Sequence, residues 1–180
     1  MMEQAALGAA ELTAICAALT PRPTADGLAA VVLTPEGEEV EVEVGRSAGW
    51  WAARWPSGKV SYWDRVAGQG VLDGMSGTQD LFCNWHCLWP VALFYPELQS
   101  VWGRPGDGFA PVRAEMVGER VLVGAARPAS WGLPEEVEVE FVLDPAFHCM
   151  TRYTREGRTT EVLSVRSAPF RRYPPDWATA

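Results

Sequence analysis

The stretch Leu28–Val44, LAAVVLTPEGEEVEVEV, decides the fold class because its apolar residues recur with a period of two. That period predicts β-strands that each have one apolar face. Within the stretch, TPEG places a proline at the first turn position and Gly37 where positive φ is favoured, so the two halves form a hairpin. Pairing across this turn sets Val32 opposite Val40, and it leaves one face wholly apolar beyond the turn.

Similar combinations of strand and turn follow along the chain. The turns WPSG (55–58) and TREG (154–157) each separate two runs rich in aromatic and β-branched residues. Strands are predicted at 50–55 and 59–63, at 147–154 and 158–166, on either side of 117–119, and over 137–144. With a short strand that ends near residue 72, this gives roughly nine strands and indicates an antiparallel sheet.

Two segments have helical patterns instead. Residues 5–19 carry apolar side chains at helical spacing, which predicts an amphipathic N-terminal helix. Residues 78–101 show no alternation and contain two prolines that can each start a helical turn, so we expect short helices at about 79–88 and about 91–101. These helices are apolar on more than one side and are expected to cover the sheet.

The size and composition of the chain are those of one globular domain, with 180 residues, 48% of them hydrophobic and 21% charged. We divide this domain into an N-terminal helix and linker (1–24), first hairpins (25–77), a helical cover (78–101), and later hairpins with a tail (102–180).

The net charge of −8 and the pI near 4.8 argue against binding to nucleic acid or to an anionic membrane, since both require a basic surface. We interpret the one basic cluster, Arg166, Arg171 and Arg172, as a solvated edge. The first residues lack the basic and apolar regions of a secretory signal, and no apolar run reaches the roughly 18 residues that cross a bilayer. We therefore expect a cytoplasmic protein with reduced cysteines and no membrane span.

The order of these elements resembles that of the lipoprotein-carrier superfamily, the LolA-like and LppX-like half-barrels. The best local match is LDPAFHCMTRYTREGRTTEV (143–162), with its strand, Asp-Pro turn, strand, glycine turn and strand. The resemblance implies a strongly curved antiparallel sheet around short helices, with an apolar cavity for acyl chains, and no catalytic motif comes with it. We accordingly expect an α+β half-barrel of roughly nine strands with an N-terminal helix and a helical cover.

The segment CNWHCLWP (83–90) concentrates two thiols and one of the two histidines. Its spacing fits no common zinc site, and on a helix His86 would lie well away from the face shared by Cys83 and Cys87. A thiol nucleophile lacks a third orienting group, and a Cys87–Cys149 disulfide conflicts with a reducing compartment. We interpret these cysteines as buried apolar residues and expect no metal and no cofactor.

Aromatic residues are the stronger signal, because they make up 11% of the chain and gather on the hairpin 50–63. Pairing across WPSG places Trp51, Trp55 and Trp63 on one face and Tyr62 on the other, so both faces are covered or line something. A solid tryptophan-rich core and a ligand cavity explain this equally well. The candidate ligand-binding residues are Trp51, Trp55, Tyr62, Trp63, Trp85, Trp89 and Phe94.

Three residues near this wall are candidates for acid or base catalysis: Asp64, Asp73 and His86. A carboxyl group buried among indoles would have a raised pKa, although turn residues facing water are the commoner case. The sequence therefore predicts binding of a small hydrophobic molecule, acyl, polyketide-like or terpenoid, with no nucleic-acid partner. The alternative is a cofactor-independent cyclase or isomerase acting on an apolar biosynthetic intermediate in the same cavity.

Overall fold

The computed structural model describes Gly8, Ile15 and residues 27–72, 74–78, 89–127 and 136–179. The strands are β1 (Gly27–Leu33), β2 (Glu39–Gly45), β3 (Trp50–Arg54), β4 (Val60–Asp64), β5 (Gln69–Leu72), β6 (Met75–Thr78), β7 (Ala110–Val117), β8 (Arg120–Ala126), β9 (Val139–Asp144), β10 (Cys149–Arg155) and β11 (Arg158–Ser167). The helical elements are the 3-10 turns η2 (Val91–Phe94) and η3 (Pro96–Leu98) and the short helix α2 (Asp176–Thr179).

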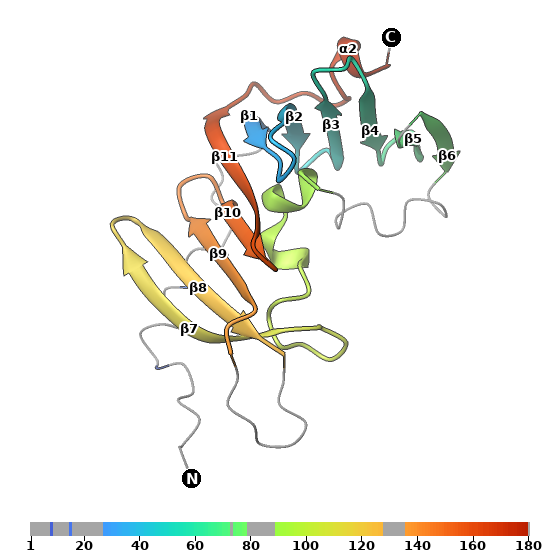
Figure 1. Ribbon diagram of the computed structural model, residues 1–180. Helices are drawn as coiled ribbons and strands as arrows, with labels where there is room; N and C mark the ends of the chain where they lie inside the picture. Colours follow the sequence, from blue (N-terminus) through green and yellow to red (C-terminus); the bar gives the residue numbers. More distant parts are fainter. Residues whose placement is uncertain are drawn as a thin grey trace.

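All eleven strands form one antiparallel sheet in the order β6-β5-β4-β3-β2-β1-β11-β10-β9-β8-β7. Strands β1 to β6 form one antiparallel meander in which consecutive strands pair, and strands β7 to β11 form a second. The pairing of β1 with β11 joins these two meanders, as Figure 1 shows. The sheet is open, with β6 and β7 as its edge strands.

The predicted hairpin registers are confirmed. Val32 lies opposite Val40 in the β1–β2 pair, and Trp51 lies opposite Trp63 in the β3–β4 pair. Gly37 has a φ of +84°, as the turn in TPEG requires. Periodicity and turn chemistry therefore agree at each of these hairpins.

The predicted α+β half-barrel with roughly nine strands is wrong, because the sheet is open and has eleven strands. Among the described residues, helical structure beyond the sheet is limited to short elements such as η2, η3 and the four-residue α2. The expected helix at 91–101 is replaced by η2 and η3. The expected N-terminal helix lies outside the described residues except for Gly8 and the buried Ile15, and the expected helix at 79–88 lies outside them entirely.

Side chains add hydrogen bonds to the 3-10 backbone bonds of the 91–101 segment. The Gln99 amide donates to the carbonyls of Ala92 and Tyr95, each at 3.2 Å, and the Trp102 indole donates to that of Pro96 at 2.7 Å. These bonds fix carbonyl groups that an α-helix would pair internally. The segment therefore packs on the sheet as two 3-10 turns.

The core lies on one face of the sheet, here called the inner face, which carries Val42, Trp51 and Phe141. Residues of η2 and the aromatic side chains after it pack against this face, and Trp102 meets Phe141 edge to face at 5.4 Å. In Figure 1, η2 and η3 lie between the two halves of the sheet. The opposite, outer face carries charged pairs such as Arg113 with Glu140 at 3.1 Å.

The C-terminal segment covers part of the outer face. The Trp50 indole donates to the Arg171 carbonyl at 2.9 Å, and the Arg54 guanidinium lies 4.9 Å from the centre of the Trp177 ring. Trp50 and Ala52 are consequently buried although they point away from the core. The inner face of the tryptophan-rich hairpin and the part of its outer face around Trp50 are thus covered, whereas Tyr62 on the outer face is only partly buried.

Candidate binding site

Two indoles form the centre of the candidate site on the inner face. Trp51 and Trp63 are direct neighbours across β3 and β4, and they are 1% and 2% exposed. The residue opposite Trp63 on β5 is Gly70, where a Cβ would lie 3.1 Å from the Trp63 ring and 2.4 Å from the Tyr62 carbonyl oxygen. Glycine is therefore required for the indole of Trp63 to lie against β5.

The indole nitrogen of Trp51 is a buried donor without an acceptor among the described residues. Other indoles differ in this respect, since Trp50 donates to Arg171 and Trp102 donates to Pro96. A buried polar group without a partner costs about 1–3 kcal/mol. Trp51 therefore combines an apolar wall with one unsatisfied hydrogen-bond donor.

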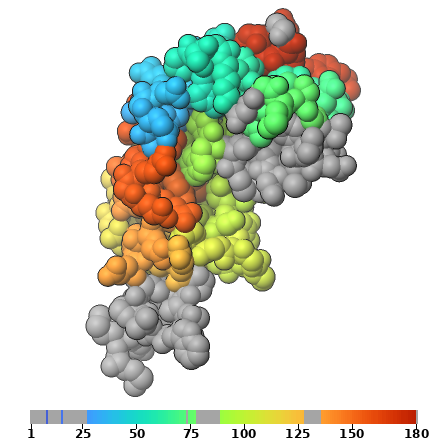
Figure 2. Space-filling view, turned by 45° about the vertical axis from the view of Figure 1, so that its right-hand side comes forward, coloured from blue at the N-terminus to red at the C-terminus, as the bar shows by residue number. Residues whose placement is uncertain are grey.

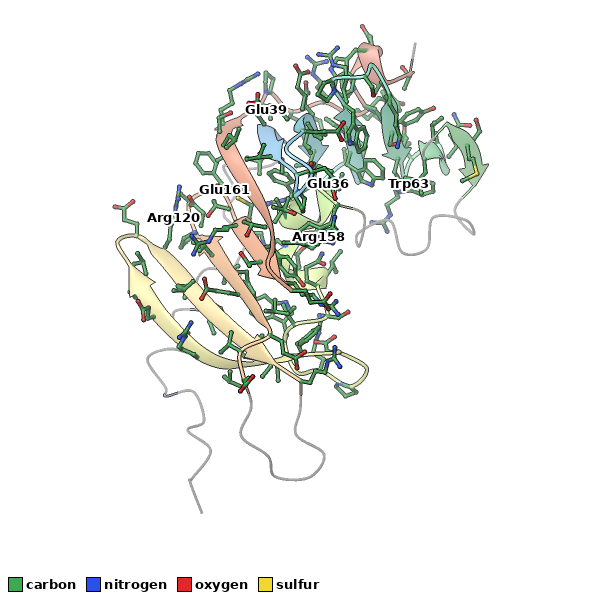
Figure 3. All side chains as sticks on the ribbon, viewed as in Figure 1. Glu36, Glu39, Trp63, Arg120, Arg158 and Glu161 are labelled. Atoms are coloured by element: carbon green, nitrogen blue, oxygen red, sulfur yellow. The ribbon has the colours of Figure 1, made fainter. Side chains whose placement is uncertain are left out.

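The structure divides the other predicted ligand-binding residues among several places. Phe94 is buried in the same core cluster, and Trp55 packs at its margin with the Lys59 ammonium 4.9 Å from its ring. Trp89 is 40% exposed and contacts Tyr153, with ring centres 4.4 Å apart and ring planes tilted by 41°. Trp85 lies outside the described residues. Figure 3 shows Trp63 among the strands of the first meander and Arg120 in the other half of the sheet.

Tyr62 lies on the outer face, apart from the indole pair. It borders a shallow surface cavity of about 350 Å³ between β4 and β6. The residues that line this cavity are Tyr62, Gln69, Gly70, Val71, Ser76 and Gly77. The predicted site residues therefore belong to two separate surfaces of the sheet.

Of the three predicted acid or base residues, the structure describes Asp64. Its carboxylate accepts the backbone N–H groups of Val66 at 2.8 Å and Ala67 at 3.1 Å. These bonds stabilise the turn after β4 and hold the carboxylate on the outer-face side, opposite Trp50 in the strand register. Asp73 and His86 lie outside the described residues.

A buried polar junction, here defined as the buried Tyr95, His148 and Cys149 with the partly exposed Arg46 and Glu97, was not predicted. The Arg46 guanidinium donates to the Phe94 carbonyl at 3.0 Å and to the His148 carbonyl. His148 Nε2 lies 3.4 Å from Glu97 Oε2, which is longer than a strong charge-assisted hydrogen bond. The junction joins the β2–β3 turn, η2, η3 and the β9–β10 turn.

Burial shifts the pKa values of the titratable groups in this junction. It raises the pKa of Cys149 to about 12, against the attraction of Arg46, and it also raises the pKa of Tyr95. Cys149 is also 1% exposed, so its environment is that of a buried apolar side chain, as the sequence led us to expect. Burial also acts to raise the pKa of Glu97, but the nearby His148 and the charge of Arg46 outweigh it, and this pKa is lowered.

The lowered pKa of Glu97 predicts a loss of stability in acid. A carboxyl group whose pKa is lower in the folded than in the unfolded chain stabilises the fold above its ordinary pKa of 4.5, and this stabilisation is lost as the pH falls through the folded-state value. Glu97→Gln should therefore lower the melting temperature at pH 6 and approach the wild-type value near pH 3. Calorimetric melts between these pH values test this, with the exposed Glu115→Gln as control. An unchanged difference between wild type and Glu97→Gln across this range would contradict it.

The described part of the chain contains neither a cluster of metal-ligating side chains nor a membrane-spanning helix. None of its residues form a group of three or more His, Cys, Asp or Glu side chains able to hold a metal ion. No helix within the same residues is long and apolar enough to span a membrane. Cys83, His86 and Cys87 lie outside these residues.

Comparison with known proteins identifies no family for this chain. No family model matches the chain, and no curated protein matches it. Among solved structures, an uncharacterized conserved protein from Thermus thermophilus is similar over 93% of this chain and 94% of that chain, with 13% identity and a TM-score of 0.44. A likeness this distant carries no argument about fold or function, so a functional proposal has to rest on the site itself.

Proposed function

We propose that this protein binds a small hydrophobic molecule bearing a hydrogen-bond acceptor, on the inner face of the sheet at Trp51 and Trp63. The observation that carries the proposal is the buried indole N–H of Trp51, which has no acceptor among the described residues. Binding sites for apolar ligands combine aromatic walls with a few polar groups that orient the guest. An acyl, polyketide-like or terpenoid oxygen would supply the acceptor that Trp51 needs.

Burial of the two indoles also predicts how the guest binds. Trp51 is 1% exposed and Trp63 is 2% exposed, so a ligand reaches the Trp51 N–H only when neighbouring side chains move. Association that requires such a rearrangement is slower than docking on a preformed surface. Slow binding is therefore expected of the proposed site.

Removal of the indole N–H should weaken the binding of ligands that carry an acceptor. For Trp51→Phe we expect about a fivefold loss of affinity for cis-parinaric acid, because one hydrogen bond contributes about 1 kcal/mol. Diphenylhexatriene has no hydrogen-bond acceptor and should bind wild type and variant within about twofold, apart from changes in packing. Fluorescence titration with both probes measures the difference.

The control for this titration is Tyr62→Phe, which removes a hydroxyl group from the outer face. It should bind both probes as the wild type does, because Tyr62 borders the separate surface cavity. If the wild type binds neither probe, the proposal fails. It also fails if Tyr62→Phe weakens cis-parinaric acid binding as much as Trp51→Phe does.

The cyclase or isomerase alternative remains a prediction without a supporting contact in the described residues. Asp64, its one described candidate acid, is engaged with the β4–β5 turn. Likewise, the resemblance to the lipoprotein-carrier superfamily and the cytoplasmic location remain predictions.

A further inference from the structure

An unusual set of arginines gathers around the C-terminal segment. In the described part of the chain, most arginines form an ion pair with a carboxylate, and Arg46 instead binds two carbonyl groups. No such pair is found there for Arg65, Arg166, Arg171 or Arg172. The sequence holds more acidic than basic residues, yet 162–175 contains three arginines and no carboxylate. Arginines without a carboxylate partner among the described residues are thus concentrated around the C-terminal segment of an otherwise acidic protein.

Two hydrogen bonds at the start of β3 place Arg65 close to Arg171. The Arg65 N–H donates to the Gly49 carbonyl at 3.2 Å, and the indole of the next residue, Trp50, donates to the Arg171 carbonyl at 2.9 Å. Arg65 and Arg171 therefore lie on either side of the start of β3. The nearby Asp64 carboxylate is turned toward the backbone of Val66 and Ala67, so it does not face these arginines as an ion-pair partner.

Large apolar side chains are exposed beside these arginines. Phe170 is 63% exposed and Tyr173 is 50% exposed, and they flank Arg171 and Arg172 in sequence. Val66, next to Arg65, is also exposed. We define the basic surface as Arg65, Phe170, Arg171, Arg172 and Tyr173. Exposed aromatic residues among basic ones are typical of surfaces that contact lipid headgroups.

The sheet holds this segment in place. The Ala168 N–H donates to the Gly27 carbonyl at 2.8 Å, Pro174 and Pro175 are buried, and α2 follows against β3 and β4. Figure 1 shows the segment after β11 passing β1, β2 and β3 on its way to α2, and Figure 2 shows red C-terminal residues at the surface next to the blue-green strands. A segment anchored at both ends loses little further freedom on binding.

We infer that the basic surface docks this protein on membranes that contain anionic lipid, in place of the solvated edge that the net charge led us to expect there. Its arginines contact lipid phosphates, while Phe170 and Tyr173 enter the headgroup region. The net charge of −8 opposes a general affinity for polyanions, so contact is confined to this side of the molecule and is screened by salt. A single-stranded nucleic acid is the competing partner, but a run of phosphates would extend beyond this small surface onto acidic parts of the protein.

Vesicle sedimentation tests the docking. The wild type should bind vesicles of phosphatidylcholine with about 30% phosphatidylglycerol, and bind pure phosphatidylcholine vesicles much more weakly. Each arginine near such a surface contributes about fivefold, so Arg171→Gln with Arg172→Gln should weaken binding by roughly 10- to 30-fold. Raising the salt concentration from about 0.1 to about 0.5 M should remove most of the binding of the wild type.

The matched control carries the same change of charge elsewhere. Arg155→Gln with Arg158→Gln alters the β10–β11 turn, where both arginines are paired with glutamates, and it should bind the mixed vesicles within about twofold of the wild type. Circular dichroism melts establish that both double variants are folded. Equal binding to neutral and anionic vesicles, or equal losses in the two double variants, would overturn the inference. Tighter binding to polyuridylic acid than to the mixed vesicles, lost in the Arg171/Arg172 variant, would overturn it in favour of nucleic acid.

Discussion

Replacement of Phe141 with alanine is expected to lower the free energy of unfolding by about 3–5 kcal/mol. Phe141 has no exposed surface, lies in the middle of β9 between Val123 and Tyr153, and meets the Trp102 ring edge to face. Loss of this ring opens a cavity between strands β7 to β11 and the segment around Trp102 that packs on them. Urea unfolding followed by tryptophan fluorescence measures the change.

Val142→Ala is the control for this substitution, because Val142 is the next residue of β9 and points to the outer face. It is half-buried there and should lower the unfolding free energy by less than about 1 kcal/mol. Comparable losses in the two variants would show that the inner face does not hold the core. The assignment of the two faces would then be wrong.

Arg46→Met is expected to destabilise the protein by about 2–4 kcal/mol. The guanidinium of Arg46 bonds the carbonyls of Phe94 and His148, which belong to η2 and to the β9–β10 turn. Methionine keeps much of the volume but leaves both buried acceptors without their donor. Because these acceptors join distant parts of the chain, the variant should also expose the covering segment to proteolysis.

Arg54→Met provides the comparison for Arg46→Met. Arg54 pairs with Glu41 on the outer face, where both side chains are largely exposed, and such pairs contribute about 0–1 kcal/mol. Arg54 also lies over the Trp177 ring, so a small loss of stability is expected. An Arg46→Met variant as stable as Arg54→Met would contradict a structural role for the buried polar junction.

The hairpins could be predicted from sequence because each one combines local alternation with a turn of known geometry. The β5–β6 hairpin was not predicted in full, because Gly70, Gly74 and Gly77 interrupt its alternation. Pairing of β1 with β11 could not be predicted from periodicity, since it joins residues far apart in the chain. Local patterns thus defined the hairpins but left open how the two meanders join.

The segment 91–101 shows why local helix signals failed. Pro90 and Pro96 suit the first turn of a helix, but the segment forms 3-10 turns whose carbonyls also accept bonds from the side chains of Gln99 and Trp102. Tertiary contacts therefore override the local preference.

At the candidate site, the facing pair Trp51 and Trp63 was predictable from the strand register, and so was the placement of Tyr62 on the other face. The buried polar junction was not, because Arg46 stands in an ordinary turn sequence, GRSAG, with no pattern that distinguishes it from a solvated residue. Its partners are backbone carbonyls of residues far along the chain. Contacts of that kind leave no periodic trace in the sequence.

The indole N–H resonance of Trp51 in a proton–nitrogen correlation spectrum tests the central claim most directly. Trp51→Phe assigns this resonance, and cis-parinaric acid is then added to the wild type. We predict a downfield shift of the Trp51 indole proton as this N–H acquires an acceptor. The chemical shift of the Trp50 indole proton should not change, because this N–H already donates to the Arg171 carbonyl. A Trp51 resonance that remains unchanged at saturating ligand would contradict binding at this site.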